Sequence, residues 1–135
     1  MPEFDERSFT TRDRLRIYYR DYHGKTSDKL PVLCLAGSSA NSQSFHGLAL
    51  RLVAQRHVLC MDWRGHGQSD WDPDYKHYGF EADRDDVFEM LCAEDLNRVV
   101  VIGTSRGGII AMLIAMTRPD LLAGVVLNDI GPVVG

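Results

Sequence analysis

Four short apolar runs, separated by longer segments with helical spacing, constrain the fold of this chain most strongly. The runs lie at residues 31–36, 57–62, 98–103 and 124–128. Uninterrupted apolar runs of this kind are typical of strands buried on both faces of a sheet. Helices are predicted between them, over residues 41–55, 80–94 and 106–117. This alternation predicts an α/β fold, a three-layer sandwich whose mostly parallel sheet carries helices on both faces.

The first part of the chain has a different pattern. Residues 14–22 are rich in aromatic and β-branched side chains with partial alternation, which predicts an antiparallel strand paired with residues 8–11. Residues 23–30 are predicted to form a loop, and residues 63–70 contain too many glycines for a regular element. No repeat, low-complexity tract or linker occurs, so a single domain over residues 1–135 is expected.

A serine motif lies between the most strand-like run and the most apolar predicted helix. Gly103-Thr104-Ser105-Arg106-Gly107 has the Gly-x-Ser-x-Gly pattern, in the strand-turn-helix context where that pattern marks a nucleophile. Larger residues two positions to either side would collide at so tight a turn, and the glycines remove that conflict. The amino end of the following helix favours negative charge at the serine. Ser105 is therefore the predicted nucleophile of an acyl-transfer site, and a chance match of the five-residue pattern is the competing interpretation.

Four segments, in their order and spacing, together resemble one family. They read LCLAG at 33–37, DWRGHGQSD at 62–70, GTSRGG at 103–108 and LNDIGP at 127–132. On these segments the chain is similar to the amino-terminal part of the α/β-hydrolase superfamily, in the branch of esterases, enol-lactonases and related C–O or C–C bond hydrolases. The resemblance implies a single α/β-hydrolase domain truncated after its sixth strand, with an antiparallel amino-terminal hairpin. The family's lid and carboxy-terminal part would then be absent from residues 1–135.

The same resemblance implies the remaining parts of the site. The backbone N–H groups of Arg106 and Ser38 match the family's oxyanion-hole donors. Asp129 is a candidate for the triad acid, although Asn128 stands at the better-matching position. The triad histidine lies late in the family's chain, so residues 1–135 are expected to contain no triad histidine and to be inactive alone.

Two further residues near these motifs could be mistaken for catalytic groups. The resemblance implies that the loop holding His66 is structural, with Ser69 and Asp70 helping to hold it, so His66 is not expected to be a base. The Arg106 side chain either pairs with a carboxylate on the substrate or lies along a wet pocket wall. Both alternatives are compatible with the sequence.

Cysteine and glycine spacings exclude several other kinds of site. The three cysteines have no paired spacing, and Cys34 and Cys60 lie in apolar runs, which predicts buried free thiols. Neither a metal nor a cofactor is expected, because no metal-binding spacing and no phosphate-binding glycine loop occurs.

These observations predict hydrolysis of a small-molecule carboxylic ester or lactone through an acyl-enzyme. Two other functions remain open. One is proton abstraction, as in cofactor-free oxygenases, lyases and haloperoxidases of the same fold. The other is a non-catalytic fragment or interaction module.

The formal net charge of −4 and the scattered arginines disfavour a nucleic-acid partner. No apolar run reaches the roughly 18 residues of a membrane span. The start of the chain is acidic and lacks a signal-peptide core, so a cytoplasmic location is expected.

The last predicted strand raises the question of partners. A strand over residues 124–128 would lie at the edge of the sheet with apolar side chains. Such edges recruit other chains. Another chain, or the absent carboxy-terminal half, is therefore expected to cover this edge, and the isolated polypeptide is expected to be unstable or to self-associate.

Overall fold

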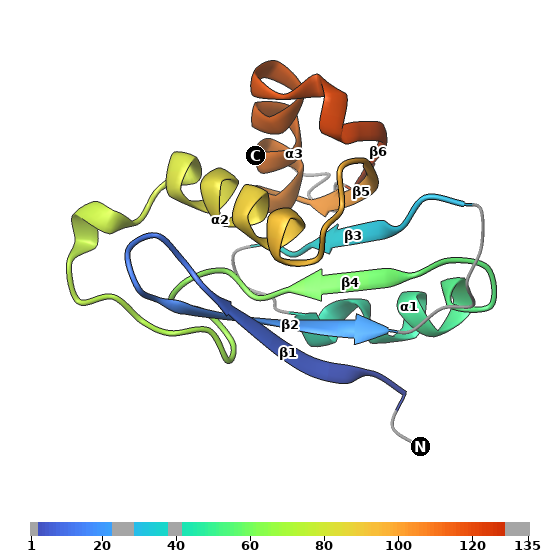
Figure 1. The fold of residues 1–135 in the computed structure, drawn as a ribbon, viewed down its shortest axis with the longest axis horizontal. Helices are drawn as coiled ribbons and strands as arrows, with labels where there is room; N and C mark the ends of the chain where they lie inside the picture. The colour runs from blue at the N-terminus through green and yellow to red at the C-terminus, as the bar shows by residue number, and fades with distance from the viewer. Residues whose placement is uncertain (1–2, 23–28, 38–41, 129–135) are drawn as a thin grey trace, which may run out of the picture.

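The computed structural model describes residues 3–22, 29–37 and 42–128. Within them, one sheet has the strand order β1-β2-β4-β3-β5-β6 (Figure 1). Its strands are β1 Asp5–Thr10, β2 Arg16–Tyr22, β3 Val32–Leu35, β4 Val58–Met61, β5 Val99–Thr104 and β6 Leu122–Asn128. The pairs β1–β2 and β2–β4 are antiparallel, and the other pairs are parallel. The predicted mostly parallel sheet with an amino-terminal hairpin is confirmed.

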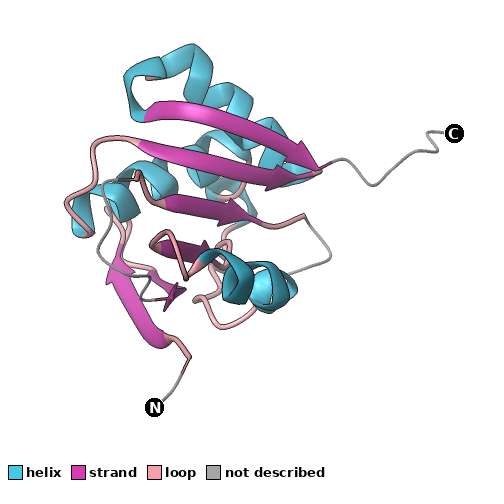
Figure 2. Ribbon diagram, turned by 90° about the vertical axis from the view of Figure 1, so that its right-hand side faces the viewer, coloured by secondary structure: helices cyan, strands magenta, loops and turns pink. Residues whose placement is uncertain are grey.

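Helices cover both faces of this sheet (Figures 1 and 2). They are α1 His46–Leu52, α2 Phe80–Ala93 and α3 Arg106–Thr117, with short 3-10 turns η1 Ser42–Phe45, η2 Tyr75–His77 and η3 Pro119–Leu121. Alternate strand residues face two separate cores, as the pleat of a sheet requires. Leu33 and Leu35 pack toward α2 and α3, whereas Val32 and Cys34 pack toward α1. The three-layer arrangement follows directly from this alternation.

The helices differ from the predictions in two respects. The segment predicted as a helix over residues 41–55 begins as the turn η1 and continues as the shorter helix α1. Nearly every position of α3 after its start is apolar, and this composition predicts a helix buried in the fold. The structure buries only the face that packs on the sheet. Its opposite face is exposed among the described residues, at Ile109, Met112 and Met116.

Two further observations concern cysteines and membrane spans. Cys34 and Cys60 are buried free thiols, as predicted, and Cys92 is an exposed one. Among the described residues, the helices are all too short or too polar to span a bilayer.

A histidine–aspartate pair joins the hairpin to the parallel part of the sheet and makes stability depend on pH. His57 Nε2 lies 2.6 Å from Oδ1 of the buried Asp21, and this contact raises the pKa of His57. The pair therefore stabilises the fold fully below the unfolded histidine pKa of about 6.5. That contribution is lost as the pH rises through the raised folded pKa.

We expect His57→Gln to lower the free energy of unfolding by about 1 kcal/mol at pH 5.5, and by less at pH 9. Urea denaturation at the two pH values measures the difference. Asp21→Asn removes the carboxylate that raises the pKa of His57, so it should also flatten the pH dependence of stability. A pH slope that persists unchanged in both variants would contradict this account of the pair.

Candidate active site

Ser105 lies at the turn between β5 and α3, in a backbone conformation that is rare for a non-glycine residue. Its φ is 52° and its ψ is −108°. The residue is exposed, it precedes the first residue of α3, and its side chain makes no capping hydrogen bond. A non-glycine residue with this geometry is strained, and strain of this kind persists only where the surrounding structure enforces it. The surroundings of Ser105 show what enforces it.

Two glycines allow the chain to turn this tightly. A Cβ on Gly103 would lie 2.6 Å from the carbonyl carbon of Gly107, and a Cβ on Gly107 would lie 2.1 Å from the carbonyl oxygen of Leu35 in β3. The steric conflict expected from the sequence is therefore present at both positions. It also involves β3, because the start of α3 packs directly on the backbone of that central strand.

The loop that follows β3 lies against the same turn. A Cβ on Gly37 would lie 3.5 Å from the Cβ of Ser105. The preceding residue, Ala36, accepts a hydrogen bond of 2.8 Å from the indole N–H of the buried Trp63. This bond fixes the first part of the loop beside Ser105. Ser38, the predicted second oxyanion donor, lies outside the described residues.

The amino end of α3 supplies backbone donors next to Ser105. Arg106 is the first residue of the helix, and the Ser105 carbonyl accepts from the N–H of Gly108 at 2.9 Å. The first N–H groups of an α-helix have no carbonyl partner within the helix. The Arg106 N–H is one of them, and the partial positive charge of the helix end adds to it. The turn can therefore stabilise negative charge that develops close to Ser105.

The side chain of Arg106 makes a contact that neither sequence interpretation included. Its Nε donates to Oδ2 of Asp83 at 2.9 Å, Nη2 contacts the same oxygen, and the guanidinium lies over the Trp63 ring at 5.5 Å from the centroid. Asp83 comes from α2 and is fully buried. Burial raises the pKa of Asp83, and the hydrogen bond from Arg106 opposes that shift. The guanidinium beside Ser105 is thus already paired within the protein.

Ser69 and Asp70 help to hold the loop around His66, as predicted. His66 Nδ1 lies 3.0 Å from the Arg64 carbonyl oxygen. The Ser69 hydroxyl donates to the Asp62 carbonyl at 2.8 Å and accepts from the Tyr18 N–H at 2.8 Å. Asp70 accepts from the N–H of Arg16 at 2.8 Å. The loop is therefore held against β2 by hydrogen bonds.

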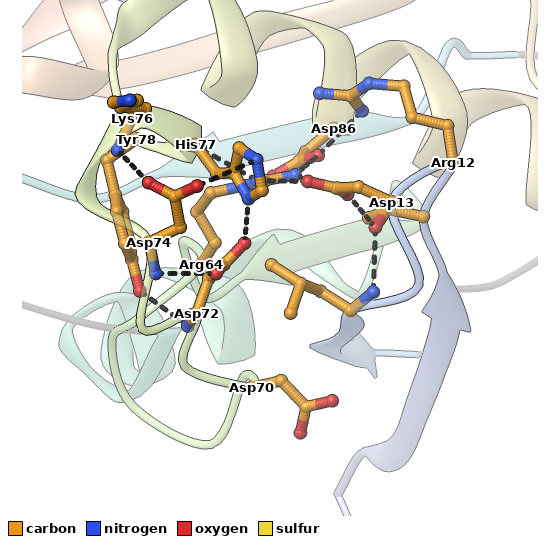
Figure 3. A network of polar contacts seen from close by, with 12 residues as sticks. Arg12, Asp13, Arg64, Asp70, Asp72, Asp74, Lys76, His77, Tyr78 and Asp86 are labelled. Carbon is orange, nitrogen blue, oxygen red and sulfur yellow. Dashed lines mark hydrogen bonds and ion pairs between the residues drawn. The ribbon is translucent and has the colours of Figure 1, made fainter.

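A buried arginine ties this loop to α2 and to the hairpin (Figure 3). Arg64 is fully buried and donates twice to Asp86 of α2, from Nε and Nη2, each at 2.7 Å. It also donates to Asp13 at 2.7 Å and to the His77 carbonyl at 2.8 Å. These hydrogen bonds hold the pKa of Asp13 well below its usual value. One side chain therefore holds three segments together.

Removing this arginine is expected to be costly. We expect Arg64→Met to lower the free energy of unfolding by about 3 kcal/mol, because the buried Asp86 loses both bonds from Arg64 and keeps only the bond from the half-exposed Arg12 at 3.0 Å. Arg118→Ala is the matched control, since its pair with Asp120 is exposed and is expected to contribute about 0–1 kcal/mol. Urea denaturation measures both variants. If Arg64→Met and Arg118→Ala lowered the free energy of unfolding equally, the buried network around Arg64 would not stabilise the fold as described.

A pocket of about 570 Å³ opens beside this network, but it lies away from Ser105. It is lined by residues such as Arg12, Lys76 and His77 and by the start of α2, and no residue of the Gly103–Gly107 turn lines it. A large pocket is the usual first candidate for a binding site. Here the turn that carries Ser105 and the pocket are formed by different residues, so we do not assign the pocket to the Ser105 site.

The structure also brings together two groups of residues that could each hold a cation. They are Asp13 with Asp72 and His77, and Asp21 with His57 and Glu94. The sequence spacing gave no sign of either. In each group an arginine already pairs with an aspartate, from Arg64 to Asp13 and from Arg7 to Asp21. We assign no metal to them.

None of the described histidines lies in contact with Ser105. Four of the five histidines fall within the described part of the chain, and their ring nitrogens contact other groups. The contacts are His46 with Tyr22, His57 with Asp21, His66 with Arg64 and His77 with Asp72. Asp129, the candidate acid, lies outside the described residues.

Sequence reasoning missed Asp83 and Asp86. These two aspartates are three positions apart in α2 and lie on the same face of the helix as its apolar residues.

Comparison with known proteins defines the class. A family model described as alpha/beta hydrolase fold matches residues 31–133. The chain therefore belongs to the α/β-hydrolase family.

Three of its relatives give the range of similarity. The chain is 32% identical over 127 residues to the sn-1-specific diacylglycerol lipase ABHD11 of Danio rerio, covering 93% of this chain and 39% of that protein. It is 30% identical over 125 residues to the putative 2-succinyl-6-hydroxy-2,4-cyclohexadiene-1-carboxylate synthase of Bacillus subtilis, covering 93% and 44%. A crystal structure of an alpha/beta hydrolase from Novosphingobium aromaticivorans superposes with a TM-score of 0.91 at 41% identity, covering 98% and 46%. The chain thus spans less than half the length of each.

Proposed function

We propose that this chain carries the nucleophile and oxyanion-hole part of a serine hydrolase that cleaves a carboxylic ester or lactone by acyl transfer to Ser105. The observation that carries the proposal is the strained, exposed Ser105 at the amino end of α3. Such a turn presents a hydroxyl together with backbone donors at the place where an acyl carbonyl would react. Glycines at the points of closest approach support the same interpretation.

In the proposed mechanism, the Ser105 oxygen attacks the carbonyl carbon of the ester while a histidine accepts its proton. The carbonyl oxygen becomes an oxyanion that accepts hydrogen bonds from the N–H groups of Arg106 and Ser38. When the tetrahedral intermediate collapses, the C–O bond to the alcohol breaks and the histidine returns the proton to the leaving oxygen. Water then hydrolyses the acyl-enzyme by the same steps. We propose that the histidine and its acid come from outside residues 1–135, with Asp129 as a further candidate for the acid.

The relatives offer support at a coarser level. The Danio rerio relative is named a lipase, which favours ester hydrolysis. The Bacillus subtilis relative is named a synthase and not a hydrolase, so proton abstraction on this fold stays a second candidate function. The two candidates differ in what they need from Ser105, because acyl transfer requires its oxygen as nucleophile and proton abstraction does not.

Covalent labelling tests the proposal. The assembled protein, meaning this chain together with the residues that supply the base and the acid, is treated with a fluorophosphonate probe. We expect stoichiometric labelling of the folded protein and none after thermal denaturation. A folded, assembled protein that refuses the probe and hydrolyses no activated ester would overturn the proposal.

The edge strand β6 is part of the same proposal. Val125, Val126 and Leu127 of β6 are exposed in the structure. We propose that another polypeptide segment covers this edge. The 135-residue chain alone is therefore expected to self-associate as its concentration rises, and Val126→Lys is expected to reduce this association, because a charged edge opposes strand pairing. Analytical ultracentrifugation measures the association of the wild-type chain and of Val126→Lys. A wild-type chain that stays monomeric at all concentrations would contradict the expectation.

We also propose a cytoplasmic location. Cys34, Cys60 and Cys92 are all free thiols. A reducing compartment preserves such thiols. In an oxidising compartment, the exposed thiol of Cys92 would be oxidised.

A further inference from the structure

The residue next to Ser105 carries a positive charge that the protein neutralises from within. Arg106 is the immediate neighbour of Ser105, and its side chain is only 14% exposed. Its Nε and Nη2 both contact Oδ2 of Asp83, whose side chain is 0% exposed. The other carboxylate oxygen of Asp83 is buried and has no hydrogen-bond partner among the residues that the structure describes. Asp83 is therefore a buried carboxylate whose described hydrogen bonds come from Arg106 alone.

Neighbouring groups keep the guanidinium in this position. The carbon at the centre of the Arg106 guanidinium lies 5.5 Å from the centroid of the Trp63 ring. Trp63 is itself fixed by its bond to Ala36, at the start of the loop that touches Ser105. A guanidinium held between a carboxylate and an aromatic face has less capacity to bind another anion. The pairing thus removes a cation from the surface that a substrate would meet.

We propose that Asp83 determines the charge selectivity of the Ser105 site, making it prefer esters with an uncharged acyl group over esters whose acyl chain carries a carboxylate. This inference rests on the proposed function. Its physical basis is distance: adjacent Cα atoms are about 3.8 Å apart, so a freed Arg106 side chain could reach an acyl group attached to Ser105. Asp83 prevents this by occupying the guanidinium. Asp83 does not touch the substrate and acts through Arg106.

Two substrates that differ by one carboxylate test the inference on the assembled protein. They are 4-nitrophenyl butyrate and the mono-4-nitrophenyl ester of succinic acid. We expect Asp83→Asn to shift the ratio of kcat/KM toward the anionic ester by about tenfold or more, as expected for a gained charge-assisted hydrogen bond. Most of the shift should appear as a lower KM for the anionic ester. The double variant Asp83→Asn/Arg106→Met should restore the wild-type ratio.

A defect that merely loosens the fold would lower both rates and leave their ratio unchanged, so the ratio separates selectivity from stability. Raising the salt concentration should shrink the shift, because the gained interaction is electrostatic. A ratio that is unchanged in a folded Asp83→Asn variant would overturn the inference. If that variant does not fold, Arg106→Gln serves instead. Burial then raises the pKa of the unpaired Asp83 without the opposing hydrogen bond from Arg106, so the ratio should turn against the anionic ester only as the pH rises and Asp83 ionises, a dependence that the paired wild type lacks.

A binding measurement keeps this inference distinct from the proposed function. Trp71→Phe removes the other, exposed tryptophan and leaves Trp63 as the fluorescent reporter beside Arg106. In that background, Asp83→Asn is expected to bind glutarate at least about tenfold more tightly than the parent does. If the binding shifts but neither ester is hydrolysed, the proposed function fails and the role of Asp83 stands. If both esters are hydrolysed and neither the ratio nor the binding changes, the role of Asp83 is wrong.

Discussion

Replacing Ser105 with alanine in the assembled protein is expected to lower kcat for ester hydrolysis by about 10⁴- to 10⁶-fold. This is the range for removing the nucleophile of a serine triad, where the oxyanion hole and substrate binding leave only residual catalysis. The fold should survive, because the Ser105 side chain makes no capping hydrogen bond. Hydrolysis of a 4-nitrophenyl ester measures the loss. Ser44→Ala, at an exposed position of η1, is the control and should keep wild-type activity.

The same variant separates the two candidate chemistries. Proton abstraction would be weakened by the loss of Ser105 but would not be abolished, because no bond to its oxygen needs to form. An alanine variant that stays within tenfold of the wild type on its best substrate would contradict acyl transfer. Proton abstraction, the second candidate function, would then become the better account.

Replacing Gly107 with alanine is expected to have the largest effect on stability. The new Cβ would lie 2.1 Å from the Leu35 carbonyl oxygen, and β3 pairs with strands on both sides, so its backbone has no room to move. We expect a loss of more than about 5 kcal/mol, which exceeds ordinary overpacking and would unfold most domains. Circular dichroism with thermal denaturation measures it.

Gly47 provides the matched control for this substitution. It lies in α1, and a Cβ there would meet no atom of the described residues within 4 Å. Gly47→Ala should leave stability unchanged or raise it by up to about 1 kcal/mol, since alanine favours a helix over glycine. A folded Gly107→Ala protein with the stability of the Gly47→Ala protein would show that α3 does not pack on β3 as described.

Local patterns were enough to predict most of the fold. The apolar run at residues 98–103 became β5 with a shift of one residue, and the helix predicted over residues 106–117 coincides with α3. The predicted hairpin is also present, with Ser8 opposite Tyr18, but β1 spans Asp5–Thr10, so the strand predicted at residues 8–11 began too late and ended one residue too far on. These elements were predictable because burial on one or two faces of an element leaves a period in the sequence.

Contacts between distant segments were not predictable in the same way. Arg64 and Asp86 are 22 positions apart, and Arg106 and Asp83 are 23 apart, so no local pattern pairs them. Val87, Met90 and Leu91 are buried at the helical spacing of α2, but that apolar period gave no reason to bury the two aspartates beside them. A charge on the buried face of a predicted helix could have signalled that a distant arginine was needed.

A non-catalytic interaction module is the remaining alternative. The exposed β6 edge is compatible with it. A strained serine conformation, however, costs about 1–3 kcal/mol and has no evident use in a docking surface. The glycines at positions 103 and 107 also favour a catalytic role, because they allow Ser105 to project from a crowded turn.

The central claim is that Ser105 reacts while the Arg106 N–H receives the developing negative charge. A crystal structure of the assembled protein after reaction with a fluorophosphonate tests it most directly. The account predicts a bond from phosphorus to the Ser105 oxygen, with the phosphonyl oxygen about 2.7–3.1 Å from the Arg106 backbone nitrogen. An adduct on another residue, or a phosphonyl oxygen directed away from the start of α3, would contradict it.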